Sequence, residues 1–310
     1  MELIALSLPL LASVIFLYAL FMLFRKRYFG ALSLLIVFVV MNWYGRIFPL
    51  NAFKKHFDNI TPIKVMTLNT SLFPNKDNYY EHLKYTANLI LKEKVDVVFL
   101  TENFYCNFDT LYRMIQPFFP YKSKSANPCG NYVYSKYPLI MDSLIVSDSI
   151  TPYALNICKL KISKRTINLV GCHLSSNNYD ERMYYRTPEQ IKSTKQFYLY
   201  LKNIIRVSQC RQKQAKKIVD LFEDELPLII VGDFNDVSGS STLNILEKAG
   251  LSDAWWEGGM GFGFTEYNLF PFRIDHILYN QRFKLINVKV IKMSTISDHN
   301  AIVGGFKLKN

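Results

Sequence analysis

Some residue types are scarce in this chain or lack informative spacing, and these absences argue against several kinds of site. The 310 residues include only five cysteines, an odd number, and none has the spacing of metal ligands. Cys158 and Cys172 lie inside apolar, strand-like runs, where buried free thiols are expected. No HExxH sequence is present, and neither His173 nor His299 has a cysteine neighbour, so a zinc site is disfavoured. Internal repeats and low-complexity linkers are also absent.

Acidic residues are fewer than basic ones. The chain has 25 Asp and Glu against 37 Lys and Arg, which gives a formal net charge of +12. A basic surface favours anionic partners such as phosphodiesters, nucleic acid or anionic lipid headgroups. The same charge is common in proteins that lie near anionic membranes, so charge alone does not choose among these partners.

Charged residues are missing altogether from residues 3–24, which are long enough to cross the ~20-residue hydrocarbon core of a bilayer. A second apolar segment, residues 31–50, carries Trp43 and Tyr44 near its far end, where aromatic side chains mark a membrane interface. A cleaved signal peptide is the alternative, but its basic residues would precede the apolar stretch, and here they follow it. We expect a hairpin of two transmembrane helices. Neither helix offers a polar intramembrane residue for a transport path.

The basic turn Arg25-Lys26-Arg27 predicts the orientation of this hairpin. Short basic loops stay on the cytoplasmic side, which places everything after residue 50 on the exoplasmic face. Positive charge at Arg46, Lys54 and Lys55 opposes this orientation. We expect an integral membrane protein, of a bacterial inner membrane by the resemblance given below, with residues 51–61 as a linker and its domain in the periplasm.

Residues 62–310 alternate short apolar runs with amphipathic stretches. Nine runs are predicted to be strands: 63–68, 95–100, 139–146, 155–160, 167–170, 228–231, 274–278, 285–291 and 301–306. Three stretches are predicted to be helices: 79–92, 187–222 and 241–249. Many strands interleaved with few helices indicate an α/β layered domain with mixed sheets. Residues 177–217 are polar and basic, and we expect them to pack loosely over the domain or to lie against an anionic surface.

Polar clusters stand where the apolar strands end. They are Asn69, Thr101-Glu102-Asn103, Gly171-Cys172-His173, Gly232-Asp233-Phe234-Asn235-Asp236, Arg273-Ile274-Asp275-His276 and Ser297-Asp298-His299-Asn300. Side chains at strand ends are where α/β folds build sites, because the sheet holds them in place. Each cluster alone has an ordinary explanation as a turn, a cap or a surface charge. Their joint occurrence, all at strand ends, indicates a functional site.

One chemistry fits these residue types. A carboxylate such as Glu102 holds a hard cation like Mg²⁺, which binds phosphate oxygens and polarises the phosphoryl group. A carboxylate such as Asp233 orients or deprotonates an attacking water. Imidazoles and amides stabilise the charge that builds on the phosphoryl oxygens. The candidates for that last role are His173, His299, Asn69 and Asn235.

Taken together, these residues resemble the endonuclease/exonuclease/phosphatase superfamily, the fold shared by pancreatic-type DNase, AP endonucleases, neutral sphingomyelinases and inositol polyphosphate 5-phosphatases. The resemblance covers about residues 62–308 and is most specific at Gly232-Asp233-Phe234-Asn235, Arg273-Ile274-Asp275 and Ser297-Asp298-His299. It implies a four-layer sandwich of two mixed β-sheets flanked by helices. With the two apolar helices in front, the chain is similar to membrane-bound bacterial members.

The resemblance also implies roles. Glu102 is the principal ligand of Mg²⁺, for which Mn²⁺ substitutes, with Asn69 beside it and Asp298 completing the network of metal and water. Asp233 activates the water. The other implied contacts are Asn235 and His173 to the scissile phosphate, and His299 to the transition state with Asp275 fixing its tautomer.

Two departures from the family pattern stand out. His276 follows Ile-Asp where the family usually has Tyr, which we expect to change packing rather than chemistry. The long insertion from residue 177 to about 211 has no counterpart in short-loop nucleases, and it weakens the transfer of any particular substrate.

These features predict a membrane-anchored, Mg²⁺-dependent hydrolase of a phosphodiester or phosphomonoester. A nuclease would use the basic insertion to neutralise phosphates, with residues Arg182, Arg186, Lys192, Lys195, Arg206, Arg211, Lys213, Lys216 and Lys217. A sphingomyelinase-like hydrolase of phospholipid headgroups would use the membrane tether, and the aromatic residues from Trp255 to Phe272 would touch lipid unless, as we expect, they are buried core. A non-catalytic binding module predicts the loss of site residues, and none is lost. The sequence carries no indication of oligomeric state.

Overall fold

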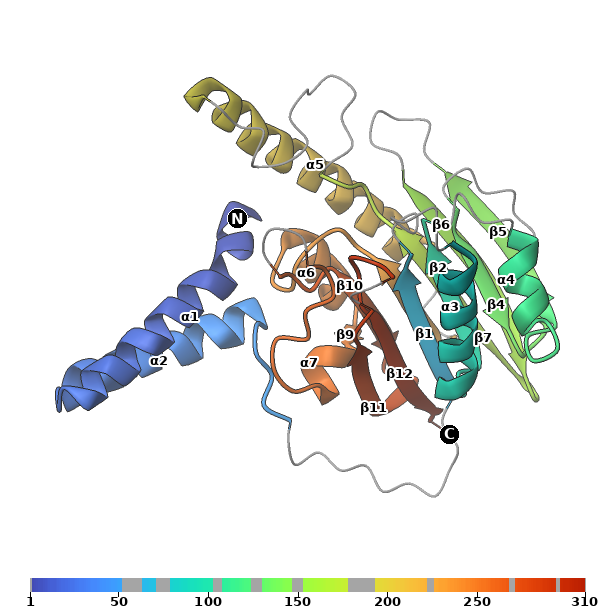
Figure 1. Ribbon diagram of the computed structural model, residues 1–310, viewed down its shortest axis with the longest axis horizontal. Helices are drawn as coiled ribbons and strands as arrows, with labels where there is room; N and C mark the ends of the chain where they lie inside the picture. The colour runs from blue at the N-terminus through green and yellow to red at the C-terminus, as the bar shows by residue number, and fades with distance from the viewer. Residues whose placement is uncertain are drawn as a thin grey trace.

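A computed structural model describes most of the chain. The described residues are 2–51, 63–70, 79–102, 108–123, 130–146, 153–177, 193–221, 226–267, 271–293 and 296–309. They form a helical hairpin and one layered domain (Figure 1).

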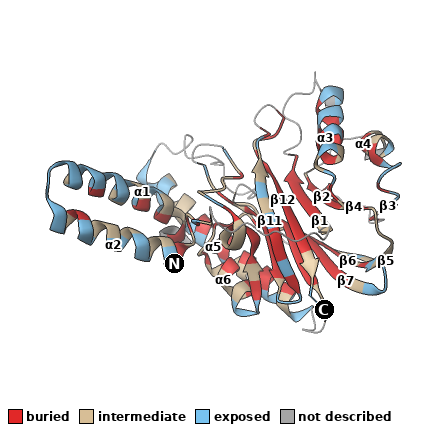
Figure 2. Cartoon of the chain, turned by 90° about the horizontal axis from the view of Figure 1, so that it is seen from below, coloured by how far each residue is buried: buried red, intermediate tan, exposed pale blue. Residues whose placement is uncertain are grey.

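The hairpin consists of α1 (Glu2–Phe24) and α2 (Tyr28–Gly45), joined by a tight turn. Ala5–Phe24 is long and apolar enough to cross a membrane, whereas the apolar part of α2, Tyr28–Trp43, is shorter. Only 17% of the most apolar window of α1 is buried, so α1 is not the core helix of a soluble domain. Figure 2 shows the exposed faces along both helices.

The second helix begins at Tyr28 and ends at Gly45, whereas the sequence predicts 31–50. Arg46 takes a left-handed backbone conformation with φ 48°, which ends the helix. The side chain of Asn42 then holds the departing chain, because its amide donates to the carbonyl of Phe48 (2.9 Å) and accepts from the amide of Phe48 (2.6 Å). Residues 46–50 of the predicted span therefore lie beyond the helix, whereas Trp43 and Tyr44 lie within it.

Two six-stranded sheets form the centre of the domain. In spatial order, one sheet contains β11 (Phe283–Ile291), β12 (Ala301–Leu308), β1 (Ile63–Asn69), β2 (Val97–Thr101), β4 (Tyr132–Ser135) and β3 (Tyr121–Lys122). The other contains β5 (Leu139–Val146), β6 (Ala154–Ile162), β7 (Arg165–His173), β8 (Leu228–Asp233), β10 (Asp275–Asn280) and β9 (Leu251–Asp253). The pairs β1–β2 and β7–β8 are parallel, and the others are antiparallel, so both sheets are mixed as predicted.

Helices cover the outer faces of the two sheets. The cluster between the sheets includes Val65, Phe99 and Ile229, which are almost completely buried. Outside the first sheet lie α3 (Tyr79–Glu93) and α4 (Phe108–Ile115), and outside the second lie α5 (Thr194–Asp220) and α6 (Ser241–Lys248). The short α7 (Ala254–Gly258) follows β9. The predicted four-layer sandwich is therefore confirmed.

All nine predicted strands are present, and the helices within 79–92 and 241–249 match within one residue. The elements that the sequence pattern missed are short: β3, β4, β9, α4 and α7. The strands among them have two to four residues and α7 has five, too few for a clear period in hydrophobicity. Of the predicted helix 187–222, residues 194–220 form α5, while 178–192 and 222 lie outside the described residues.

Candidate active site

The polar clusters meet at one end of the two sheets, because strands from both sheets end there. Asn69 is the last residue of β1 and lies opposite Thr101 of β2. His173 is the last residue of β7 and lies opposite Asp233, the last residue of β8. Asp275 begins β10, antiparallel to β8, and also lies opposite Asp233. The sheets thus bring together residues from distant parts of the chain.

The first group of side chains consists of Glu102, His173, Asp233 and Asn69. The Asn69 amide donates to Glu102 Oε1 (3.1 Å) and to Asp233 Oδ2 (2.9 Å). His173 Nε2 lies 3.4 Å from Glu102 Oε1 and 4.0 Å from Asp233 Oδ2. One ligand atom from each of Glu102, His173 and Asp233 lies within 4.8 Å of the others. Among the described residues, neither carboxylate pairs with a lysine or an arginine.

The second group consists of Asp233, Asp275 and His299, again within 4.8 Å of one another. His299 Nδ1 lies 2.7 Å from Asp275 Oδ2. Burial raises the pKa of the Asp275 carboxyl, with Asp233 adding to the increase and His299 opposing it. Burial alone would lower the pKa of His299, but the charges of Asp275, Asp233 and Asp298 hold it well above its usual value. The geometry and charges favour a protonated His299 beside a carboxylate.

Asp233 belongs to both groups, and the local backbone fixes its position. Gly232 has φ 141°, and a Cβ there would lie 1.9 Å from the Cys172 carbonyl oxygen, so only glycine fits before Asp233. Asp233 Oδ1 accepts from the backbone amide of Asn235 (2.7 Å), and the side-chain amide of Asn235 donates to the Leu174 carbonyl (2.9 Å). The Gly-Asp-Phe-Asn sequence therefore forms a hydrogen-bonded turn that orients the Asp233 side chain towards the site.

Two site residues other than glycine have left-handed backbone conformations. Glu102 has φ 55° and Asn235 has φ 51°. Residues other than glycine rarely adopt left-handed backbone conformations, and those that do cluster at functional sites. Glu102 follows β2 directly, so this turn directs its carboxylate back over the sheet end towards Asn69 and His173.

The late Ser-Asp-His sequence is tied to the first sheet. The Ser297 hydroxyl donates to the Asn69 carbonyl (2.7 Å) and accepts from the His299 amide (3.0 Å). Asp298 is not part of either close group among the described residues. Its backbone carbonyl accepts from the Tyr267 amide (3.1 Å), and its Oδ1 is buried without a hydrogen-bond partner in the described part of the chain. The charge of Asp298 contributes to the raised pKa of the neighbouring His299.

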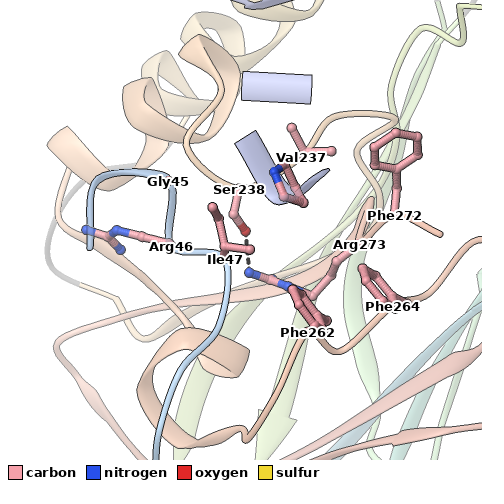
Figure 3. Close-up of a pocket in the computed structure, with 10 residues that line it drawn as sticks. Gly45, Arg46, Ile47, Val237, Ser238, Phe262, Phe264, Phe272 and Arg273 are labelled. Atoms are coloured by element: carbon pink, nitrogen blue, oxygen red, sulfur yellow. Dashed lines mark hydrogen bonds between the residues drawn. The ribbon is translucent and has the colours of Figure 1, made fainter. Parts of the chain in front are cut away.

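The sequence pattern missed a layer of buried residues that supports the site. Thr265 Oγ1 accepts from the amides of Ile274 (3.1 Å) and Asp275 (3.0 Å), which positions Asp275. Arg273 pairs with Asp253 (2.6 Å) and contacts Ser238 (Figure 3). His276 is fully buried, with its Nδ1 3.2 Å from Asp253 Oδ2. A hydrophobic pattern does not detect such buried polar pairs, because they interrupt it.

Arg211 is a correction to the expected phosphate-binding surface. Its side chain is 1% exposed, pairs with Asp236 (3.2 Å), and donates to the Ser175 carbonyl (3.0 Å) and to Asn177 (3.0 Å). A buried, paired guanidinium cannot neutralise a nucleic-acid backbone. α5 is likewise packed on the domain through Val207, Ala215 and Ile218, so this part of 177–217 does not lie loosely.

The residues present fit a hard divalent cation. One amide, that of Asn69, holds the oxygens of Glu102 and Asp233 near one another, and no lysine or arginine among the described residues compensates their charge. Two adjacent buried or half-buried carboxylates without such a partner are typical of a cation site. The Oδ1 atoms of Asp275 and Asp298, which are buried without a hydrogen-bond partner among the described residues, are further acceptors. The donor set is rich in oxygen and contains no thiolate, which favours Mg²⁺ or Mn²⁺ over zinc.

Comparison with known families then identifies the domain. The sequence profile of the Endonuclease/Exonuclease/phosphatase family matches residues 66–299, about three quarters of the chain. The chain belongs to this family. Its members are generally phosphoester hydrolases that use divalent metals. No curated protein matches the chain.

Solved structures of this family share the fold. An endonuclease/exonuclease/phosphatase from Bacteroides vulgatus superposes with a TM-score of 0.62 at 14% identity, covering 81% of this chain and all of that one. TDP2 from D. rerio, complexed with a single-strand DNA product, gives 0.60 at 16% identity, covering 81% of this chain and all of that one. A family protein from Beutenbergia cavernae gives 0.60 at 16% identity, covering 81% of this chain and 72% of that one. At these identities the likeness is one of fold.

Proposed function

We propose that this protein is a membrane-anchored, Mg²⁺-dependent hydrolase that cleaves a phosphodiester or phosphomonoester by metal-assisted attack of water. The observation that carries the proposal is that Asp233 belongs to both groups of site residues. Its carboxylate lies with Glu102 and His173 on one side and with Asp275 and His299 on the other, each set within 4.8 Å. A cation site and a charge-stabilising imidazole therefore face the same carboxylate, as hydrolysis of a phosphoester requires.

Glu102 is the proposed principal metal ligand, with Asn69 beside it and Asp298 as a further contributor through its buried Oδ1. A bound Mg²⁺ supplies Lewis-acid polarisation of the phosphoryl group and neutralises its charge, and Mn²⁺ substitutes for it. Asn69 also keeps Glu102 and Asp233 in register, because its amide donates to both.

Asp233 orients a water molecule and accepts its proton as the water oxygen forms a bond to phosphorus. The bond from phosphorus to the leaving oxygen breaks in the same displacement, and that oxygen is protonated. His299, held by Asp275, donates to the phosphoryl oxygens, where charge builds. His173 and Asn235 are proposed contacts of the scissile phosphate at the rim of the site.

Several features of the hairpin support its place in a membrane. The small residues Ala5, Ala12, Ala19 and Ala31 are buried, whereas large apolar ones such as Leu17 and Phe21 are exposed. This arrangement is typical of helices packed in lipid and would leave a large apolar surface in water. We propose that the basic turn 25–27 lies on the cytoplasmic side and the domain on the exoplasmic, periplasmic side, integral to a bacterial inner membrane.

Two substrate classes remain distinct candidates. A nuclease is favoured by the exposed Lys213, Lys216 and Lys217 on α5 and by the DNA product bound to the fold neighbour TDP2. A sphingomyelinase-like hydrolase of phospholipid headgroups is favoured by the anchor. A non-catalytic module is disfavoured, since the candidate residues lie together in a coherent site.

The test is hydrolysis of bis(p-nitrophenyl) phosphate and p-nitrophenyl phosphate by the full chain. We expect Mg²⁺ to support turnover, EDTA to abolish it, and added Mg²⁺ or Mn²⁺ to restore it. Turnover that persists in EDTA, or its absence in folded protein with Mg²⁺, contradicts the proposal. Plasmid DNA, RNA and sphingomyelin vesicles assayed in parallel then separate the substrate classes.

A further inference from the structure

An apolar cavity of about 370 Å³ lies between the start of α1 and the catalytic domain. Its walls include Leu6, Pro9 and Leu10 of α1, Ile204 of α5, and the rings of Phe264 and Phe272. This volume falls within the ~300–1,000 Å³ typical of ligand sites. Among the described residues that line it, Ser7 and Ser13 are the only ones with polar side chains. This described part of the lining offers no charge for a nucleotide or a free anion.

One wall of the cavity belongs to the segment that is apolar enough to cross a membrane. The lining residues of α1, from Leu6 to Ser13, fall within Ala5–Phe24. Both ends of the hairpin meet the domain, and its turn points away (Figure 1). Arg46 pairs with Glu247 (2.6 Å), and the Pro49 carbonyl accepts from Gly261 (3.1 Å), so the domain is docked where the hairpin would leave the bilayer. A lipid chain can enter such a cavity from the bilayer without crossing water.

The opposite wall is attached to the candidate active site. The rings of Phe262 and Phe264 stack with centroids 4.8 Å apart, and Phe264 meets Tyr267 edge-on at 6.5 Å. The Tyr267 amide donates to the Asp298 carbonyl. Asn300 donates to the Phe264 carbonyl (3.0 Å). A continuous aromatic segment therefore leads from the cavity to residues beside His299.

The aromatic segment is held on its other side as well. Phe262, Phe264 and Phe272 also border a small space of about 30 Å³ closed by Gly45 and Ile47 of the hairpin end and by Val237 (Figure 3). Phe48 packs edge-on against Phe262 with centroids 4.8 Å apart. The hairpin and the catalytic loops thus share one packed junction, and the large cavity opens beside it.

We infer that this cavity binds a hydrocarbon chain of a membrane phospholipid whose phosphoester is hydrolysed at the site formed by Glu102, Asp233 and His299. The inference rests on the proposed function and narrows its substrate to a lipid. Burial of each methylene in an apolar cavity is favourable, so chain length should govern specificity. A nucleic acid has no hydrocarbon chain whose burial in this apolar lining would favour binding.

A chain-length series tests the inference. The full chain in phosphatidylcholine vesicles is given methyl and dodecyl p-nitrophenyl phosphate, two diesters with the same leaving group. Ser13→Trp fills the cavity, whereas Ser33→Trp is the matched control, because Ser33 makes the same bond to its i−4 carbonyl on the exposed face of α2. We expect all three proteins to hydrolyse the methyl ester equally. The dodecyl-to-methyl ratio of kcat/KM should fall at least ~10-fold in Ser13→Trp and stay unchanged in Ser33→Trp.

These outcomes separate the two proposals. Partition of the dodecyl ester into the vesicles is the same for all three proteins, so the difference between variants reports the cavity. An unchanged ratio in Ser13→Trp overturns the lipid-chain inference while methyl ester turnover upholds the proposed function. Absence of methyl ester turnover in the wild type contradicts the proposed function itself.

Photolabelling gives a readout that does not need turnover. Vesicles contain a phosphatidylcholine with a diazirine in its acyl chain, and labelled peptides are mapped by mass spectrometry. We expect labelling of domain peptides that contain Ile204 and Phe262–Phe264, and its loss in Ser13→Trp but not in Ser33→Trp. Labelling restricted to α1 and α2 overturns the inference.

Discussion

Asp233 is the residue on which both halves of the site converge. It is almost completely buried, and its two oxygens accept from Asn69 and from the Asn235 amide. An asparagine at this position keeps the shape but loses the negative charge and the ability to take a proton. The proposed catalytic role of Asp233 can therefore be tested separately from its role in packing.

We predict that Asp233→Asn lowers kcat for a chromogenic phosphodiester by at least ~100-fold, the scale expected when an acid–base group is removed. Asp220→Asn on the exposed end of α5 is the control and should leave kcat unchanged. Steady-state kinetics at saturating Mg²⁺ measures both. A rate for Asp233→Asn within about threefold of wild type would refute the assigned role.

A second prediction at this scale concerns the buried pair of His299 and Asp275. Removing one partner of a buried pair costs about 3–5 kcal/mol, because the other charge is left uncompensated. His299→Ala should therefore lower the free energy of unfolding as well as turnover. Adding Asp275→Asn to that variant should recover most of the stability but no activity.

Urea unfolding of His299→Ala, Asp275→Asn and the double variant measures the coupling between the two residues. Additive losses of stability would show that the 2.7 Å contact contributes little to the fold. Recovery of turnover in the double variant would show that His299 is not the group that stabilises charge.

At the scale of elements, α5 anchors the loops that carry the site. Arg211 reaches from this helix to Asp236, which follows the Gly-Asp-Phe-Asn turn, and to Ser175 and Asn177 after His173. We predict that Arg211→Met lowers the free energy of unfolding by about 3–5 kcal/mol, because Asp236 loses its buried counter-charge. Lys213→Met, exposed on the same helix, should change it by less than about 0.5 kcal/mol. Equal stability of the two variants, measured by urea unfolding, would contradict this role.

The contact between the hairpin end and α6 predicts a pH dependence. Burial raises the pKa of Glu247 from 4.5 to about 7, although Arg46 opposes the increase. The folded state then binds a proton more tightly than the unfolded state, so this group's contribution to stability is full below about pH 4.5 and is lost as pH rises through 7. We expect the difference in Tm between wild type and Glu247→Gln to fall over that interval. A difference that is constant with pH, or rises with it, would contradict the assignment.

At the scale of the whole molecule, the proposed membrane span of the hairpin would hold the site near a membrane surface. Arg46, the positive charge nearest the domain, pairs with Glu247 and lies over the Trp256 ring, whereas the turn 25–27 is at the far end of the hairpin. Among the described residues, the positive charge of Arg46 is therefore paired within the protein, in contrast to the basic turn at the other end of the hairpin. This difference supports the orientation drawn from the basic turn.

We predict that protease added to right-side-out membrane vesicles digests the domain, and that a carbonate wash leaves the chain in the membrane. Replacing Arg25, Lys26 and Arg27 with serine should move a measurable fraction of the domain to the protected side, because basic loops set orientation. Replacing the exposed Lys213, Lys216 and Lys217 with serine is the matched control and should not. Protection of the wild-type domain in these vesicles would reverse the proposed orientation.

The sequence by itself determined the features that depend on local order. An uncharged run, apolar strands and the polar residues that follow them are features of neighbouring positions. The helical pair, the nine longer strands and the layered α/β class could therefore be predicted, and the polar residues at strand ends could be singled out as candidates. Strands of two to four residues and a helix of five carry too few positions for a period, which is why β3, β4, β9 and α7 were missed.

Only the tertiary structure decided which of these residues meet. Asn69 and Asp233 are 164 positions apart, and Arg46 and Glu247 are 201 apart, so no local pattern relates them. Their contacts depend on which strands pair and on how the hairpin docks, and these are set by packing of the whole chain. For the same reason the sequence did not show that Arg211, expected to bind phosphate, is buried and paired with Asp236. The cavity beside Phe264 likewise depends on the packing of α1 against the domain.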